Sequence, residues 1–342
     1  MTESERKIFP HDALVRRVFG VPDHAAAQFR STLPPTILEH LDLDTLRVED
    51  SSFVSEELRG TVVDMLYSAS YRNRPAFLYV LFEHMSTVDP LMPLRGLSGA
   101  IRVWERHVQN ARARDAAVLP LPVVLVQVLH HSDAGWTAGT RFEQLFDPTI
   151  LSDPAVQSAV PHWGFLLDDI SRVDDAHIHA RQLDPVVTLT LVLLRDSRDG
   201  KALVHTIRAH YSEFEAVYRS PGGREAFLVF VLYVLTVTQG AVGREAFEAL
   251  KAVPGAGDVV MTYAEELRFE GKVEGKVEGK VEGKVEGMVV ATRQMVLRLL
   301  GHKFPALPAE LRARVERASE AECIVWADRL LDATSLNDIF VD

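Results

Sequence analysis

Cysteine is nearly absent from this sequence, and long apolar runs and an excess of basic charge are absent too. A single cysteine, Cys323, among 342 residues excludes an intrachain disulfide framework and a zinc–cysteine cluster. Such low cysteine usage is typical of a reducing compartment, and the charged segment 1–9 lacks the apolar run of a signal peptide, so we expect a cytoplasmic protein. The longest apolar runs, such as 227–237, are too short to cross a membrane, so no membrane partner is expected.

The charge balance is acidic as a whole and basic in one place. A net charge of −11 argues against a protein that coats nucleic acid. Segment 95–114, however, holds five arginines and one acid, a net charge of +4. We expect an amphipathic helix over 93–113 whose Arg95, Arg102 and Arg106 contact DNA phosphates. A solvated helix face is the alternative interpretation of these arginines.

Residues 61–86 predict a β-hairpin with one acid in each strand. Facing residues of an antiparallel pair have indices that sum to a constant. A turn centred between Asn73 and Arg74 gives 147, which is also the sum for Asp64 and Glu83. We therefore expect these two carboxylates on one face, with Cβ atoms ~5 Å apart. A divalent cation such as Mg²⁺ would relieve their repulsion. Two solvated acids at the strand ends are the alternative.

The remaining strands are expected around this hairpin. Residues 46–48 predict a first strand antiparallel to it. Residues 121–129 form a near-continuous apolar run, typical of a strand that is covered on both faces, and we place it beside the hairpin after a crossover helix. Residues 163–170 predict a fifth strand, with Asp168 and Asp169 in solvent.

Two adjacent histidines, His130 and His131, follow the apolar run 121–129. Neighbouring residues of an extended chain point to opposite sides, so the two histidines do not form a metal-binding pair. We interpret them as a polar strand end.

Several short segments occur in a set order along the first ~250 residues. They are His11-Asp12, Arg17-Val18-Phe19, Ser52-Phe53-Val54, Asp64-Met65-Leu66, Leu78 to Ser86, Met92 to Arg95, Leu121 to Val124, and Trp136. The ordered set resembles the PD-(D/E)XK nuclease superfamily. More closely, it resembles the recombination-promoting nuclease family, also called the YhgA-like transposases.

This resemblance implies a fold and a chemistry. The fold would be α/β: a mixed sheet flanked by helices, then a helical subdomain and a small α-helical tail. The function would be that of a Mg²⁺-dependent DNA endonuclease linked to recombination. Asp64 and Glu83 would hold the metal, and Asp12, on the first helix, would add a ligand or orient water.

One position departs from the family. The superfamily carries a lysine two residues after the glutamate, and this family usually carries a glutamine, but here the residue is Met85. A thioether neither carries charge nor orients water well, so we expect weak cleavage or none. The alternative function is a catalytically inactive DNA-binding or assembly protein that keeps the nuclease fold. An α-helical scaffold without a nucleic-acid role is a third interpretation, based on the net charge and on a repeat.

The repeat divides the expected domains. We predict a nuclease-like domain over 8–255, whose helical subdomain covers 183–255, then a repeat linker over 256–290 and a helical C-terminal domain over 291–342. Lys-Val-Glu-Gly occurs four times in 272–287, and a glycine at every fourth position weakens a helix. A passive spacer and a packed helix are the two interpretations of this repeat. The tail is small, and self-association through the repeat and the C-terminal helices would stabilise it.

Overall fold

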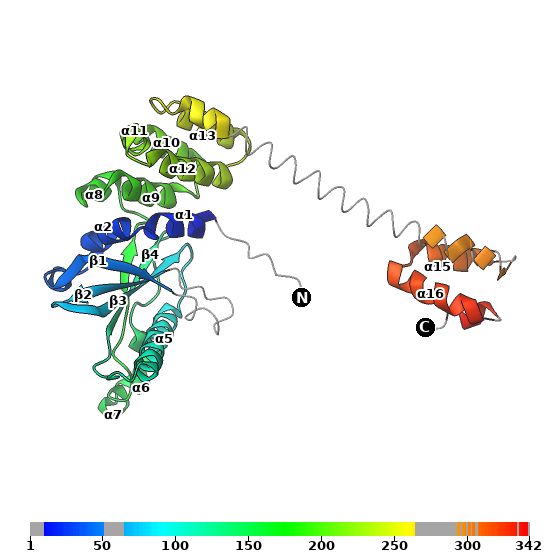
Figure 1. Cartoon of the computed structure of the whole chain (residues 1–342), viewed down its shortest axis with the longest axis horizontal. Helices are drawn as coiled ribbons and strands as arrows, with labels where there is room; N and C mark the ends of the chain where they lie inside the picture. Colours follow the sequence, from blue (N-terminus) through cyan, green and yellow to red (C-terminus); the bar gives the residue numbers. More distant parts are fainter. Residues whose placement is uncertain are drawn as a thin grey trace. The chain divides into compact units, whose positions relative to one another are not determined.

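The computed structural model describes residues 10–50, 65–263 and 293–340, except positions 295, 299, 302, 305, 306 and 334. Within the third strand, residues 75–79, 81 and 83 are described by their backbone alone. The chain divides into two units, residues 1–261 and 262–342, and Figure 1 labels the elements of each. The repeat at 272–287 lies outside the described residues, so its two interpretations stay predictions.

A five-stranded mixed sheet forms the centre of the first unit. Its strands are β1 (Leu41–Glu49), β2 (Met65–Tyr71), β3 (Arg74–Met85), β4 (Val123–His130) and β5 (Leu166–Asp169), and they lie side by side in chain order. The β1–β2 and β2–β3 pairs are antiparallel, whereas the β3–β4 and β4–β5 pairs are parallel. The sheet confirms the predicted α/β class, the antiparallel unit and the placement of β4.

Helix α5 (Met92–Ala113) covers one face of this sheet. It is the crossover that a parallel β3–β4 connection requires. Its Ala100 and Val103 join a buried cluster with Val126 and Val128 of β4. Gly96 allows the close approach, because a Cβ atom there would lie 2.6 Å from Cη2 of Trp163.

Helices α1 (Pro10–Phe19) and α2 (Pro22–Thr32) cover the opposite face, as Figure 1 shows, and the short α3 (Pro35–Leu38) contacts β1. Proline at the first helical position suits the start of each of these helices, because its missing N–H would have no helical partner. Phe19 and Phe29 pack edge-to-face on Phe82, and all three side chains are buried. Tyr67 in β2 donates a hydrogen bond to the carbonyl oxygen of Phe19 at 2.5 Å. These contacts fix α1 over β2 and β3.

The end of β5 differs from the prediction. The Asp168 side chain is only 7% exposed and accepts two hydrogen bonds from Arg181, both at 2.9 Å, and one from Gln28 at 2.7 Å. Asp169 accepts the backbone N–H of Trp136 at 2.7 Å. The expectation that both acids face solvent was wrong, because each is paired inside the structure. The η1 turn (Phe142–Leu145) and helices α6 (Pro148–Leu151) and α7 (Pro154–Gln157) lie between β4 and β5.

Six helices follow β5 and form a layer beyond α1 (Figure 1): α8 (Asp175–Ala180), α9 (Pro185–Asp196), α10 (Gly200–Ala209), α11 (Tyr211–Arg219), α12 (Gly223–Val237) and α13 (Gly240–Lys251). Helix α9 is buried along 187–194, and both α9 and α12 contact α1. Helices α10 and α11 follow each other almost directly. The chain breaks between them at His210, whose φ of −111° and ψ of 30° are not helical.

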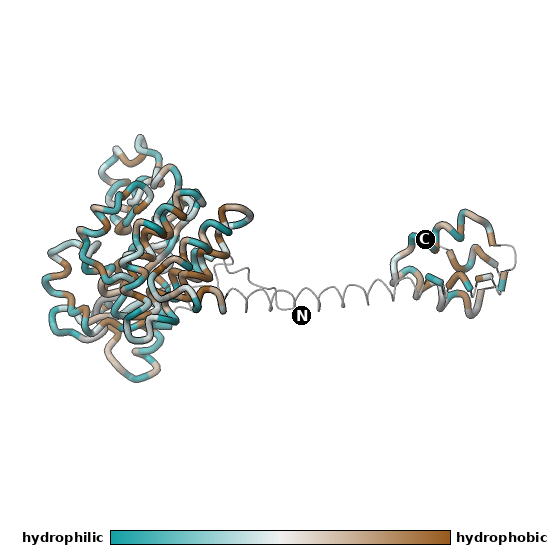
Figure 2. Tube along the Cα trace, turned by 90° about the horizontal axis from the view of Figure 1, so that it is seen from above, coloured by the Kyte–Doolittle hydropathy of each residue, from teal (hydrophilic) through white to brown (hydrophobic). Residues whose placement is uncertain are grey.

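The second unit has its own small core. It contains helices α15 (Ala309–Arg317) and α16 (Glu320–Asp332) and the η2 turn (Leu336–Asp338), and its buried side chains include Val296, Leu300, Val315, Trp326 and Ile339. Figure 2 shows apolar stretches in both units. Among the described residues, no helix is both long and apolar enough to cross a membrane.

Candidate active site

The β2–β3 hairpin has the predicted register, but its turn lies at a different position from the predicted one. The turn is centred between Arg72 and Asn73, both with positive φ (49° and 60°), and Tyr71 pairs with Arg74. The predicted centre was one residue too late. An irregularity in the pairing between Ala69 and Tyr71 corrects the count, so that all pairs from Ala69–Leu78 to Met65–Phe82 have indices that sum to 147. The predicted constant is therefore right for these pairs.

The structure does not describe the side chains of the two predicted metal ligands, Asp64 and Glu83. Asp64 lies outside the described residues, directly before β2. Glu83 is described by its backbone, which pairs with Val128 of β4. Their facing arrangement stays a prediction.

Met85 is the last residue of β3 and pairs with His130 of β4. Its side chain is partly buried and packs against the cluster under α5. Nη1 of Arg95, on α5, lies 4.0 Å from its sulfur, and the same nitrogen forms an ion pair with Asp89 at 2.8 Å. A cationic group thus lies beside the position where the superfamily carries a lysine.

Asp12 lies in the first turn of α1 and contacts the end of β3. His84 donates a hydrogen bond from Nδ1 to Oδ1 of Asp12 at 2.9 Å. The His84 side chain is fully buried, whereas that of Asp12 is 39% exposed. Asp12 is therefore held next to the strand residue that follows Glu83, and it also lies at a helix N-terminus, where an acid is favourable.

Sequence reasoning missed a cluster of three histidines. His11, His84 and His131 come from α1, β3 and the residue after β4. The rings of His84 and His131 stack with centroids 5.1 Å apart, and His11 meets His131 edge-on at 5.1 Å. His130 points away from the cluster and packs on Trp136. The two adjacent histidines do point to different sides, as predicted, and both are fully buried, which was not predicted.

Burial favours the neutral form of two members of this cluster, His11 and His131. It lowers the pKa of His131 to about 2, with a further contribution from His84 and His11, and lowers the pKa of His11 to about 4. Nδ1 of His11 is hydrogen-bonded to the Tyr233 hydroxyl at 2.9 Å, and burial raises the pKa of that tyrosine. The only sequence signal was a histidine at each of three element ends, and the fold alone brings them together.

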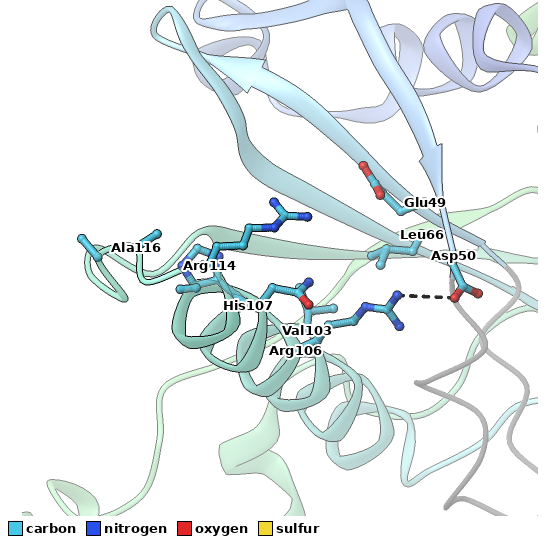
Figure 3. Close-up of a pocket in the computed structure, with 11 residues that line it drawn as sticks. Glu49, Asp50, Leu66, Val103, Arg106, His107, Arg114 and Ala116 are labelled. Atoms are coloured by element: carbon cyan, nitrogen blue, oxygen red, sulfur yellow. Dashed lines mark hydrogen bonds and ion pairs between the residues drawn. The ribbon is translucent and has the colours of Figure 1, made fainter.

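The predicted DNA-contacting arginines lie along α5. Figure 3 shows a pocket where Arg106 of α5 and Arg114, directly after α5, point toward Glu49, the last residue of β1, and Asp50. Arg106 forms a 3.5 Å ion pair with Asp50, and both partners are at least 40% exposed. Part of the basic face of α5 therefore lies beside two acids, Glu49 and Asp50, which reduce the positive potential of that part.

The chain has an α/β nuclease-like fold followed by helices. Three features define it: a sheet of mixed strand directions, a crossover helix between β3 and β4, and a first helix that contacts the end of β3. The profile described as "Putative transposase, YhgA-like" matches residues 9–222. The chain belongs to this family, which includes the recombination-promoting nucleases.

Curated relatives from Escherichia coli agree. Recombination-promoting nuclease RpnD of strain O157:H7 is 31% identical over 172 residues, 49% of this chain and 62% of RpnD, so the match spans less than two thirds of that relative. RpnA of strain K12 is 26% identical over 265 residues, 77% of this chain and 85% of RpnA. The inactive nuclease-like protein RpnE of K12 is 27% identical over 208 residues, 60% of this chain and 65% of RpnE. No solved structure matches the chain. The relatives support a nuclease- or transposase-like function.

Proposed function

We propose that this chain is a metal-dependent DNA endonuclease of the recombination-promoting family, with Asp64 and Glu83 as metal ligands and Asp12 as a third acid near the end of β3. The β2–β3 register carries the proposal. Five consecutive pairs share one index sum and end at Met65–Phe82. The next pair in that register would be Asp64 and Glu83, on neighbouring strands.

The donor set of the proposed site fits Mg²⁺. Asp64, Glu83 and Asp12 offer carboxylate oxygens only, and hard oxygen ligands suit this ion. The Asp12 carboxylate is partly exposed, and its bond from His84 uses one of its two oxygens. When bound, Mg²⁺ would lower the pKa of a coordinated water and offset the charge on the scissile phosphate.

The surrounding residues have separate roles in this proposal. His84 orients Asp12 through its Nδ1–H, and the buried ring of His131 stacks against His84 and fixes the imidazole plane. Arg95, whose Nη1 lies 4.0 Å from the Met85 sulfur, would offset phosphate charge there. Met85 itself contributes no polar group, which weakens activation of the attacking water.

A second candidate function is a DNA-binding or assembly protein without turnover. The packing of Met85 against the α5 cluster favours it, because the position usually held by glutamine is filled by an apolar side chain that joins the core. The existence of a relative named as inactive shows that family members without activity occur.

Cleavage of supercoiled plasmid DNA tests the proposal. We expect weak nicking with Mg²⁺ that EDTA abolishes and that Asp64→Asn removes. The matched control is Asp44→Asn, which alters an exposed acid of β1 and should leave nicking at the wild-type rate.

DNA affinity, measured separately by fluorescence anisotropy, distinguishes the two candidates. Wild-type binding without nicking supports the inactive DNA-binding protein. Metal-dependent nicking that persists in Asp64→Asn would contradict the assigned ligands. Absence of both binding and nicking would reject both candidates.

A further inference from the structure

Three side chains that commonly bind metals meet in the helical layer. His179 lies in α8, His210 at the break between α10 and α11, and Glu213 in the first turn of α11. One ligand atom from each lies within 4.8 Å of those of the other two. Nε2 of His179 is 3.7 Å from Oε1 of Glu213, and the two imidazole rings stack with centroids 5.4 Å apart.

His210 is prepared for a ligand at Nε2. Its side chain is 2% exposed, and its Nδ1 lies 3.0 Å from the carbonyl oxygen of Thr206. A carbonyl only accepts hydrogen bonds, so Nδ1 carries the proton and Nε2 of the neutral ring presents its lone pair. Among the described residues, this buried Nε2 has no hydrogen-bond partner. An unpaired buried polar atom is unfavourable, and a metal ion would satisfy it.

We propose that His179, His210 and Glu213 bind a divalent transition-metal ion, with Zn²⁺ as the best match. Zinc bonds of ~2.0–2.2 Å in a tetrahedron place neighbouring ligand atoms about 3.3–3.6 Å apart. The 3.7 Å separation of the His179 and Glu213 atoms is close to this, and small side-chain rotations would close the rest. Two imidazoles favour zinc over Mg²⁺ or Ca²⁺.

The charges around the cluster fit a dication. Oδ2 of Asp175 lies 3.8 Å from Nε2 of His210 and can fill a fourth position. The other Asp175 oxygen forms an ion pair with Arg195 at 2.8 Å, so the arginine lies in the outer layer and fixes this carboxylate. The side chains of His179 and Glu213 are 46% and 21% exposed, which leaves the cluster open to ions from solvent.

The ion would join two parts of the first unit. Helix α8 follows β5 and is connected to it by the Arg181–Asp168 ion pair. The bound metal would tie α8 to the start of α11. This is a structural role, and it is independent of the proposed nuclease chemistry.

Zinc binding by the full-length chain tests the site. The metal-free protein is titrated with Zn²⁺ against a chromophoric chelator, and Co²⁺ substitution reports tetrahedral coordination by its visible bands. We expect His179→Ala and Glu213→Gln, both at accessible positions, to bind one ion fewer than wild type or to bind it at least tenfold more weakly. His177→Ala is the matched control, because His177 lies on the same helix with a 77% exposed side chain.

Thermal unfolding gives a second measurement. Zinc should raise the Tm of wild type and of His177→Ala, because a ligand that binds the folded state stabilises it, and should not raise the Tm of the two cluster variants. Asp64→Ala must retain this zinc, which separates the site from the nuclease centre. Equal stoichiometry, affinity and Tm response in wild type and His179→Ala would overturn the proposal.

Discussion

Nη1 of Arg95 lies 4.0 Å from the sulfur of Met85, so a cation from α5 reaches the strand position at which this family usually carries a glutamine. Met85, the residue that departs from the family pattern, is therefore in contact with the basic helix α5. The contact also makes substitutions at position 85 a test of the proposed nuclease function.

We expect Met85→Gln to increase Mg²⁺-dependent plasmid nicking, because an amide can orient the attacking water. Loss of one such group typically lowers kcat by ~10²–10³. Met85→Lys should gain less, since it places a second cation beside Arg95. Exposed Met261→Gln is the control. If both position-85 variants lose stability by roughly 1–3 kcal/mol and gain no activity, Met85 has become a core residue.

The α5 face should bind DNA through charge. Arg106→Ala should weaken DNA binding at low salt. It should also lower the slope of log affinity against log salt concentration by about one, the contribution of one phosphate contact. Asp50→Asn should strengthen binding, because it removes the acid that pairs with Arg106. Arg208→Ala, on the helical layer, is the control. Affinities are measured by anisotropy across a salt series. Equal effects of the two arginine variants would exclude a specific role for α5.

The Asp168–Arg181 pair should be important for stability. Asp168→Ala leaves the buried Gln28 and the partly buried Arg181 without their shared acceptor, and removal of one partner from a buried pair typically costs about 3–5 kcal/mol. Glu245→Gln is the control: it breaks a pair whose partners are both 51% exposed, so at most ~1 kcal/mol is expected. Urea unfolding measures both variants. Similar losses would contradict the assigned roles.

Acid should destabilise the histidine cluster. The pKa of His131 is lowered from an ordinary value near 6.5 to about 2, so the unfolded chain takes up its proton first as the pH falls. Stability associated with this group is full above pH ~6.5 and declines below it by up to ~1.4 kcal/mol per pH unit. His131→Asn should therefore flatten the decrease in Tm between pH 6.5 and pH 4. Exposed His177→Asn should follow wild type.

The repeat can be shortened to test its role. If 272–287 is a passive spacer, deletion of one or two Lys-Val-Glu-Gly copies should leave Tm and any nicking nearly unchanged, since changes in loop length cost little. Calorimetry and light scattering measure stability and oligomeric state. A large drop in Tm, or a change in oligomeric state, would show that the repeat packs as a helix.

The sequence predicts the elements better than their ends and their environment. Apolar runs predicted the β3–β4 pairing and α5, because periodicity and length distinguish a buried strand from an amphipathic helix. The hairpin turn was displaced by one residue, because the positive φ values of Arg72 and Asn73 leave little trace in composition.

The environment of polar residues was harder to predict. Asp168 was expected in solvent and is buried, because its partner Gln28 and the helix that carries it come from a distant part of the chain. His130 and His131 were interpreted as a polar strand end, and the burial of their side chains was not predicted. The contact of Asp12 with His84, 72 residues away, likewise follows from the placement of α1 over the sheet.

Strand order equal to chain order has a consequence during synthesis. Each strand that leaves the ribosome finds its neighbour already made, so the sheet can grow from β1 toward β5 without inserting a strand between two others. The hairpin forms early, but the parallel partner of β3 arrives only after α5 has been translated. A nascent chain that stops before residue 123 would therefore expose the β3 edge and lack His131, so truncated products should be aggregation-prone rather than active.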